Sequence, residues 1–180
     1  MMKVYVFLAE GFEEIEAVTI IDVLRRARLD VKTVSISSGL EVTGAHSIKL
    51  FCDLMFDCDS MLDGDMLVLP GGPGTNKLYE HQGVVSLIKS YSEKDKWIAA
   101  ICAAPFILGR MGLLNGKAAT CYPGCETDLK GAVLSTDRVV HDGNIITSRC
   151  PATAMDFALK LVEVLKGKDL SDKLYSAMQC

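Results

Sequence analysis

Cys102 is the residue whose sequence setting best suits nucleophilic chemistry. An apolar run, Trp97 to Ile101, precedes it, and Ala103-Ala104-Pro105 follows it. This order predicts a strand, a one-residue turn and a helix start, because proline is tolerated in the first helical turn. Unpaired N–H groups at a helix N-terminus favour thiolate over thiol. We therefore expect an exposed thiol with a lowered pKa in a nucleophile elbow. The alternative is a buried core cysteine.

Glu16 departs from the pattern of a simple amphipathic helix. At helical spacing it shares a face with the apolar residues Phe12 and Ile20, whereas Glu13 and Glu14 are expected to face solvent. Burial would raise the pKa of the Glu16 carboxyl and keep it protonated. Such a carboxyl can donate a hydrogen bond to a thiolate and move a proton. The alternative is an acidic residue favoured in a first turn by the helix dipole.

The segment Gly71-Gly72-Pro73-Gly74 is a glycine-rich turn that follows a short apolar run. Backbone N–H groups in such a turn can bind an anion, but the segment lacks the ending of a P-loop and the spacing of a dinucleotide fingerprint. The alternative is a tight turn without a ligand. Beside a nucleophile, the N–H groups of Gly72 and Ala103 would together stabilise an oxyanion.

The positions of these residues follow from the alternation of apolar runs with helical stretches. This alternation predicts an α/β fold with a mostly parallel sheet covered on both faces. The runs are Val4 to Ala9, Val31 to Ile36, Met66 to Leu69 and Ile98 to Ile101. Ligand sites of open α/β sheets lie beyond the carboxyl ends of the strands. We therefore expect Glu16, Gly71, Gly72 and Cys102 to meet at one sheet edge.

Three further elements are indicated by turn residues. A hairpin around Gly44 is expected within Val42 to Leu50, and a second one at Asp142-Gly143-Asn144. The last long helix is expected to start after Pro151, with Thr153 as its cap, and to run to Gly167.

The composition favours one globular domain over residues 1–180. Hydrophobic residues make up 49% of the 180 positions, and the formal net charge is −4. Lysine and arginine are scattered, so a nucleic-acid partner is not indicated. No apolar stretch is long enough to cross a membrane, and the first apolar run is too short for a signal peptide. We therefore expect a soluble protein without nucleic-acid or membrane partners.

The cysteines indicate free thiols rather than a disulfide framework. They form an odd set without C-x-x-C spacing, which suits a reducing cytoplasm. Cys121-x-x-x-Cys125 could supply two zinc ligands, but the three histidines are isolated and form no H-x-x-x-H pair. We therefore expect no metal and no other cofactor, with Cys121 in the core and Cys125 in a loop. The seven cysteines are Cys52, Cys58, Cys102, Cys121, Cys125, Cys150 and Cys180.

Four segments together resemble the ThiJ/PfpI superfamily and, within it, the DJ-one branch of parkinsonism-associated protein deglycases. The resemblance spans nearly the whole chain and implies a flavodoxin-like three-layer sandwich and a homodimer built partly on the first helix. That helix is apolar on more than one face, which also favours a second subunit. The segments are Glu13-Glu14-Ile15-Glu16, Leu69-Pro70-Gly71-Gly72, Ala99 to Pro105 and Thr147-Ser148-Arg149.

The resemblance also implies roles for individual residues. Cys102 would be the oxidisable nucleophile, Glu16 its protonated partner, and Gly72 and Ala103 the backbone donors, with Gly71 beside them in the pocket. Members of the family are described as redox sensors and stress proteins, with glyoxalase or deglycase activity on reactive carbonyl compounds. We expect a cytoplasmic sensor with possible glutathione-independent glyoxalase or deglycase activity, whose partners are a small carbonyl compound or an oxidant.

Of three positions expected in the pocket, two differ from the family pattern and one matches it. Family members often place a histidine near the cysteine, and Tyr122 stands at that position here. An arginine that helps to form an anion site in the family corresponds to His46, whereas Arg26 matches its usual companion. The absence of the imidazole at position 122 favours a sensor over an enzyme.

Other classes of function are kept as alternatives. A cysteine hydrolase of the same superfamily is disfavoured because its protease-like branch has histidine where this chain has Ala103. A glutamine amidotransferase needs a late H-x-E pair, whereas His141 is followed by Asp142-Gly143. A non-catalytic interaction or chaperone-like domain is the third alternative.

Overall fold

A seven-stranded sheet forms the centre of the computed structural model, which describes residues 2–178. Neighbouring strands pair in parallel, except that β10 is antiparallel to β11. The predicted free thiol Cys180 lies outside the described residues. In spatial order the strands are β10 (Val139–Asp142), β11 (Ile145–Ser148), β7 (Trp97–Ile101), β6 (Met66–Leu69), β1 (Lys3–Leu8), β2 (Asp30–Ser35) and β5 (Leu54–Met55).

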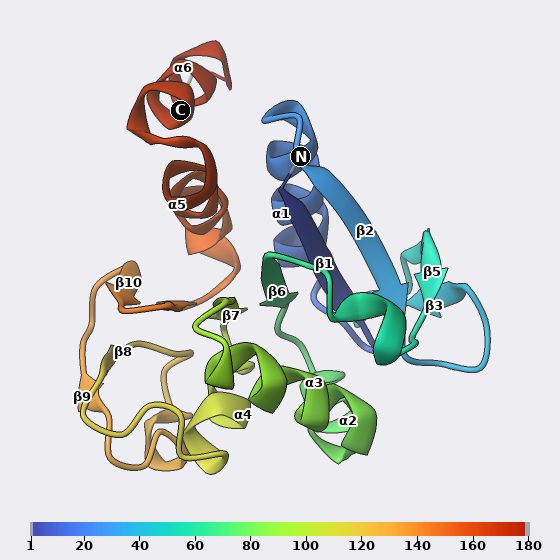
Figure 1. The fold of residues 1–180 in the computed structure, drawn as a ribbon, viewed down its shortest axis with the longest axis horizontal. Helices are drawn as coiled ribbons and strands as arrows, with labels where there is room; N and C mark the ends of the chain where they lie inside the picture. Colours follow the sequence, from blue (N-terminus) through green and yellow to red (C-terminus); the bar gives the residue numbers. More distant parts are fainter. Residues whose placement is uncertain (1, 179–180) are drawn as a thin grey trace.

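Helices cover both faces of this sheet, and Figure 1 shows α1 beside α5 on one side and α2, α3 and α4 on the other. Alternate residues of β1 enter two separate cores, because successive side chains of a strand point to opposite faces. Val4 and Val6 pack with α1 and α5, whereas Tyr5 and Phe7 pack with α3 and α4. The helices are α1 (Glu14–Arg26), α2 (Thr75–Glu80), α3 (Gln82–Glu93), α4 (Pro105–Arg110), α5 (Ala154–Lys166) and α6 (Lys168–Met178).

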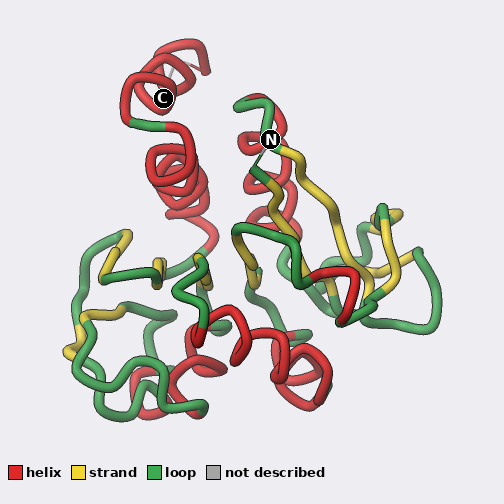
Figure 2. The backbone as a smooth tube through the Cα atoms, in the orientation of Figure 1, coloured by secondary structure: helices red, strands yellow, loops and turns green. Residues whose placement is uncertain are grey.

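Both hairpins predicted from the sequence are present, and several smaller elements lie outside the main sheet. The hairpin predicted around Gly44 is present as β3 (Glu41–Thr43) and β4 (Lys49–Phe51), and the hairpin predicted at residues 142–144 joins β10 to β11. Residues 111–138 are mostly loop and turn (Figure 2). That region contains the short pair β8 (Ala118–Ala119) and β9 (Val133–Leu134), while single 3-10 turns are η1 (Asp59–Met61), η2 (Glu126–Asp128) and η3 (Pro151–Thr153).

The predicted α/β sandwich with a mostly parallel sheet is confirmed, but two details of the C-terminal region were wrong or missing. Helix α5 follows Pro151 and ends before Gly167 as predicted, and Thr153 is its N-cap residue. The Thr153 side chain makes no capping hydrogen bond, because its hydroxyl bonds the backbone of Cys150 and the hydroxyl of Ser148 instead. Helix α6 was not predicted, and it packs against α5 through Leu170 and Leu174. Within residues 2–178, no helix has the length and apolar character needed to cross a membrane.

Candidate functional site

The predicted elbow is present at the carboxyl end of β7. Cys102 follows the strand directly and has a left-handed backbone, with φ of +64°, which is uncommon for a residue with a side chain. The chain then turns through Ala103 and enters α4, where Pro105 takes a first-turn position. Ala100 and Ala104, two residues to either side of Cys102, are fully buried. This backbone geometry is that of a strained strand-to-helix turn, as in a nucleophile elbow.

The glycine turn after β6 lies against this elbow. A Cβ atom on Gly71 would lie 2.5 Å from Cys102 Cβ and 2.7 Å from Glu16 Oε2, so a larger residue would separate the two side chains. Gly72 has a φ of +93°, and a Cβ atom there would lie 2.5 Å from the carbonyl oxygen of Gly11. Glycine at position 71 therefore permits the close approach of Glu16 to Cys102, and glycine at position 72 permits the close approach of the segment that precedes α1.

Glu16 comes from the first turn of α1 and is fully buried. The Gly71 N–H donates a hydrogen bond of 2.7 Å to Glu16 Oε2, whereas Oε1 has no partner among the described residues. Burial raises the pKa of the carboxyl to about 7, although the Gly71 N–H and the Cys102 thiol lower it. A carboxyl with this pKa exchanges protons near neutral pH, as a general acid or base must.

The electrostatics of Cys102 differ from the expectation. Burial and the neighbouring Glu16 carboxylate raise the pKa of the thiol, whereas the N–H groups of Ala103 and Gly72 lower it. The prediction of an exposed thiol was wrong, because only 9% of Cys102 is exposed, and burial opposes the predicted pKa lowering. The repulsion from Glu16 disappears when its carboxyl binds a proton. Protonation of Glu16 therefore makes the thiolate less unfavourable, although burial still raises the pKa of the thiol.

Glu13, Glu14 and His46 form a second cluster at the start of α1. The prediction that the two acids face solvent was wrong, because the β3–β4 hairpin folds over them and leaves 9% of Glu13 and 5% of Glu14 exposed. The His46 N–H donates to Glu14 Oε1 at 2.6 Å, and His46 Nδ1 lies 2.8 Å from Glu14 Oε2. These residues offer ligating atoms within 4.8 Å of one another, but both Glu14 oxygens are already hydrogen-bonded.

The other pocket residues predicted from the sequence lie at different distances from Cys102. Tyr122 is adjacent through its backbone, since its N–H donates a 2.7 Å hydrogen bond to the Cys102 carbonyl, but 46% of the residue is exposed. Arg26 ends α1 and pairs with Asp22 at 2.6 Å. Ten helical residues place Arg26 about 15 Å along the axis from Glu16. The described chain therefore does not bring Arg26 to the thiol.

The two cysteines weighed as zinc ligands have different surroundings. Cys121 is buried in the core beneath α3 and α4, and burial raises the pKa of its thiol to about 12. The prediction that it packs in the core is confirmed. Cys125 is half-buried in the turn before η2, close to Ala103 across a cavity.

Comparisons of sequence and of structure with known proteins identify the same group of relatives. The model of the DJ-1/PfpI family matches residues 2–164. Protein dj-1beta of Drosophila melanogaster is 40% identical over 91% of this chain and 89% of its own length. A deglycase of Pyrococcus horikoshii is 33% identical over 92% of this chain and its entire length. The structure of oxidized DJ-1 from Toxoplasma gondii superposes with a TM-score of 0.93 at 33% identity, covering 99% of this chain and 98% of that one.

Some relatives are considerably longer than this chain. Protein DJ-1 homolog B of Arabidopsis thaliana is 38% identical over 97% of this chain, which spans only 40% of that relative. The chain likewise spans 45% of Protein DJ-1 homolog A from the same species. The matched segment holds the elbow, the glycine turn and Glu16, and the resemblance found in the sequence is confirmed. The chain belongs to the DJ-1/PfpI family.

Proposed function

We propose that Cys102 attacks reactive carbonyl compounds, in a glyoxalase or deglycase reaction that needs no glutathione. The observation that carries this proposal is the buried Glu16 carboxyl, which has a pKa of about 7 and lies beside the Cys102 sulfur. The backbone N–H groups of Ala103 and Gly72 donate to the same sulfur. Such a group can move protons at neutral pH without the histidine that Tyr122 replaces. Relatives named as deglycases support the same chemistry.

The reaction balances without an oxidant or cofactor. The Cys102 sulfur adds to the aldehyde carbon of a 2-oxoaldehyde, and the resulting alkoxide takes a proton to give a hemithioacetal. The Gly72 and Ala103 N–H groups lie where they can stabilise developing negative charge. Glu16 then removes the proton from that carbon while the ketone oxygen gains a proton, which gives an enediol. Return of a proton to the neighbouring carbon, with loss of the hydroxyl proton on the first carbon, produces the thioester of a 2-hydroxy acid. Water hydrolyses the thioester and restores the thiol.

Incubation with methylglyoxal in the absence of glutathione tests this proposal. We expect the wild-type protein to produce lactate and Cys102→Ser to produce none. Cys121→Ser is the matched control, since it removes another buried thiol. Equal lactate formation by wild type and Cys102→Ser would show that the sulfur takes no part.

Oxidation of the same thiolate is a second candidate function, and the oxidised state of the Toxoplasma relative favours it. Two equivalents of peroxide would convert Cys102 thiolate to sulfenate and then to sulfinate, releasing two waters in all. A protonated Glu16 would stabilise the sulfinate by a charge-assisted hydrogen bond. We expect Glu16→Gln to accumulate about fivefold less sulfinate by mass spectrometry. Equal yields in Glu16→Gln and Glu93→Gln would remove Glu16 from this process.

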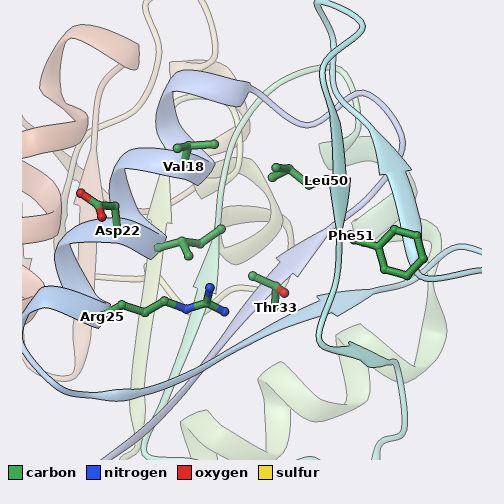
Figure 3. Close-up of a pocket in the computed structure, with 7 residues that line it drawn as sticks. Val18, Asp22, Arg25, Thr33, Leu50 and Phe51 are labelled. Carbon is green, nitrogen blue, oxygen red and sulfur yellow. The ribbon is translucent and has the colours of Figure 1, made fainter.

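We also propose a cytoplasmic homodimer that uses α1 and the β3–β4 hairpin, without nucleic-acid or membrane partners. Ile15, Val18 and Phe51 expose 59%, 45% and 75% of their surfaces, which is unusual for neighbouring large apolar residues. A groove between α1 and β4, lined in part by Val18 and Phe51, lies on the same face (Figure 3). Sedimentation should give a dimer at micromolar concentration, and a monomer there would contradict the proposal.

A further inference from the structure

A cavity of about 270 Å³ is lined by residues of the glycine turn, of the elbow and of α4. Gly72 and Ala103 both line it, and their backbone N–H groups are the ones that stabilise the Cys102 thiolate. A carbonyl carbon bonded to the sulfur would therefore stand at the edge of this cavity. The volume is close to the lower end of the roughly 300–1,000 Å³ that small-molecule sites span. The cavity thus has room for the part of a substrate that does not react.

An arginine–aspartate ion pair forms part of the cavity lining. Arg110 of α4 donates from Nε to Asp128 Oδ1 at 2.9 Å, and its guanidinium carbon lies 4.8 Å from the centre of the Phe106 ring. The ion pair and the ring together hold the guanidinium in one orientation. Among the described residues, no hydrogen bond engages the terminal nitrogens of Arg110 or the side-chain amide of Asn76, which also lines the cavity.

This wall offers donors and acceptors without a net charge, because Asp128 compensates Arg110. A carboxylate ligand would find no excess positive charge, and a purely apolar ligand would leave the polar groups unpaired. A hydroxyl group both donates and accepts hydrogen bonds, so it matches an arginine–aspartate pair next to an amide. The apolar ring of Phe106 suits the carbon chain between hydroxyls.

We infer that the cavity is a specificity pocket for the hydroxylated chain of a 2-oxoaldehyde. Asn76 and Arg110 are then specificity residues, and the preferred substrate is a neutral sugar-derived 2-oxoaldehyde that is longer than methylglyoxal. This inference rests on the proposed carbonyl reaction and changes none of its steps. One water is added, the aldehyde carbon becomes a carboxylate and the neighbouring ketone becomes an alcohol.

The test compares kcat/KM for two substrates, methylglyoxal and 3-deoxyglucosone, whose six-carbon chain carries hydroxyl groups. We expect Asn76→Ala and Arg110→Gln each to lower kcat/KM for 3-deoxyglucosone about tenfold and to leave methylglyoxal within twofold of wild type. Arg138→Gln is the matched control, because Arg138 also pairs with an aspartate, Asp156, on a different surface. The exposed Asn76 variant keeps the test decisive even where Arg110→Gln weakens the packing of α4.

The outcomes separate this inference from the proposed function. Turnover of methylglyoxal that depends on Cys102, combined with equal losses for both substrates in the Asn76 variant or with no loss for either, would overturn the specificity pocket alone. A wild-type protein that converts neither substrate would overturn the carbonyl reaction and the pocket together. A loss confined to 3-deoxyglucosone would support both.

Discussion

Glu14 and Glu16 lie two residues apart in the first turn of α1, yet their carboxyl pKa values move in opposite directions. Burial acts to raise both values. At Glu14 the His46 ring and the backbone N–H groups of His46 and Ile48 outweigh burial, so its pKa is lowered. At Glu16 the Gly71 N–H and the Cys102 thiol do not outweigh burial, and the pKa rises to about 7.

The difference shows that the packing partner, rather than the position in the helix, decides what each carboxyl can do. Both acids lie in the favourable field of the helix N-terminus, so the dipole cannot separate them. A histidine that can carry charge keeps Glu14 ionised, and the result is a structural ion pair that ties the hairpin to α1. A neutral thiol and a single N–H leave Glu16 able to bind a proton near pH 7, which suits proton transfer.

The largest expected effect concerns the rate of carbonyl conversion. Glu16→Gln should lower kcat/KM for methylglyoxal about a thousandfold, because it removes the carboxyl that we propose transfers protons, and general acid–base assistance is worth roughly 10² to 10⁴. Lactate formation measures this rate. Glu14→Gln, two residues away in the same helix turn, should retain the rate within threefold. Similar losses in both variants would make Glu16 a structural residue like its neighbour.

The next effect concerns stability as a function of pH. A carboxyl whose pKa rises from 4.5 to about 7 on folding keeps its proton to higher pH in the folded state. Its stabilising contribution is therefore complete below about pH 4.5 and is lost as the pH rises to about 7. Relative to Glu16→Gln, the wild-type protein should lose about 3 kcal/mol of unfolding free energy over this interval, measured by urea denaturation.

Glu14→Gln is the control for the stability measurement, because folding shifts the pKa of Glu14 in the opposite direction to that of Glu16. The folded-state pKa of Glu14 is lowered, so its contribution is present above the unfolded value and is lost only as the pH falls below about 4.5. The stability difference between wild type and Glu14→Gln should be flat between about pH 5 and pH 6, below the range in which His46 loses its proton. A similar slope for both variants over that interval would contradict the assignment of the two environments.

Much of this site could be predicted because its residues break local patterns. Cys102 stood between a strand-like run and a small-small-proline helix start, and Glu16 was an acid on an apolar stripe. These features are local, and the parallel strands then bring them to one edge of the sheet. Helix α6 also carried a readable signal, since Leu170, Leu174 and Met178 repeat every four residues and pack against the core.

The features that were not predicted depend on contacts between distant segments. The burial of Glu14 arises from the β3–β4 hairpin, where Gly44 has no Cβ atom to collide with the Glu14 carboxyl. The burial of Cys102 arises from the glycine turn and from Glu16 across the sheet edge. Arg110 and Asp128 are 18 residues apart in the sequence, and no local spacing indicates the ion pair that they form in the cavity wall.

A smaller effect is expected from restoring an imidazole beside the thiol. The Tyr122 N–H donates a hydrogen bond to the Cys102 carbonyl, so a histidine at position 122 would have its backbone next to Cys102. Tyr122→His should raise methylglyoxal turnover about tenfold, since an imidazole with a pKa near 6.5 exchanges protons more readily than a phenol. Tyr122→Phe is the control and should leave turnover unchanged. Wild-type turnover in both variants would mean that Glu16 alone moves the protons.

The smallest effect is expected for the ion pair between Glu14 and His46. His46→Ala removes the ring that holds Glu14, but His46 is exposed and exposed ion pairs contribute little to stability. We expect the melting temperature to fall by at most a few degrees and lactate formation to stay within twofold of wild type.

The pH dependence of that small loss gives the sharper test. Glu14 raises the pKa of His46, so the pair stabilises the fold most below about pH 6.5 and loses this contribution as the pH rises through the folded-state pKa. The fall in melting temperature caused by His46→Ala should therefore be larger at about pH 6 than at about pH 9. A fall that is equal at the two pH values would indicate that the imidazole acts by packing alone. A large loss of lactate formation in the same variant would instead couple the two carboxyls, and Glu14 would no longer serve as the structural counterpart of Glu16.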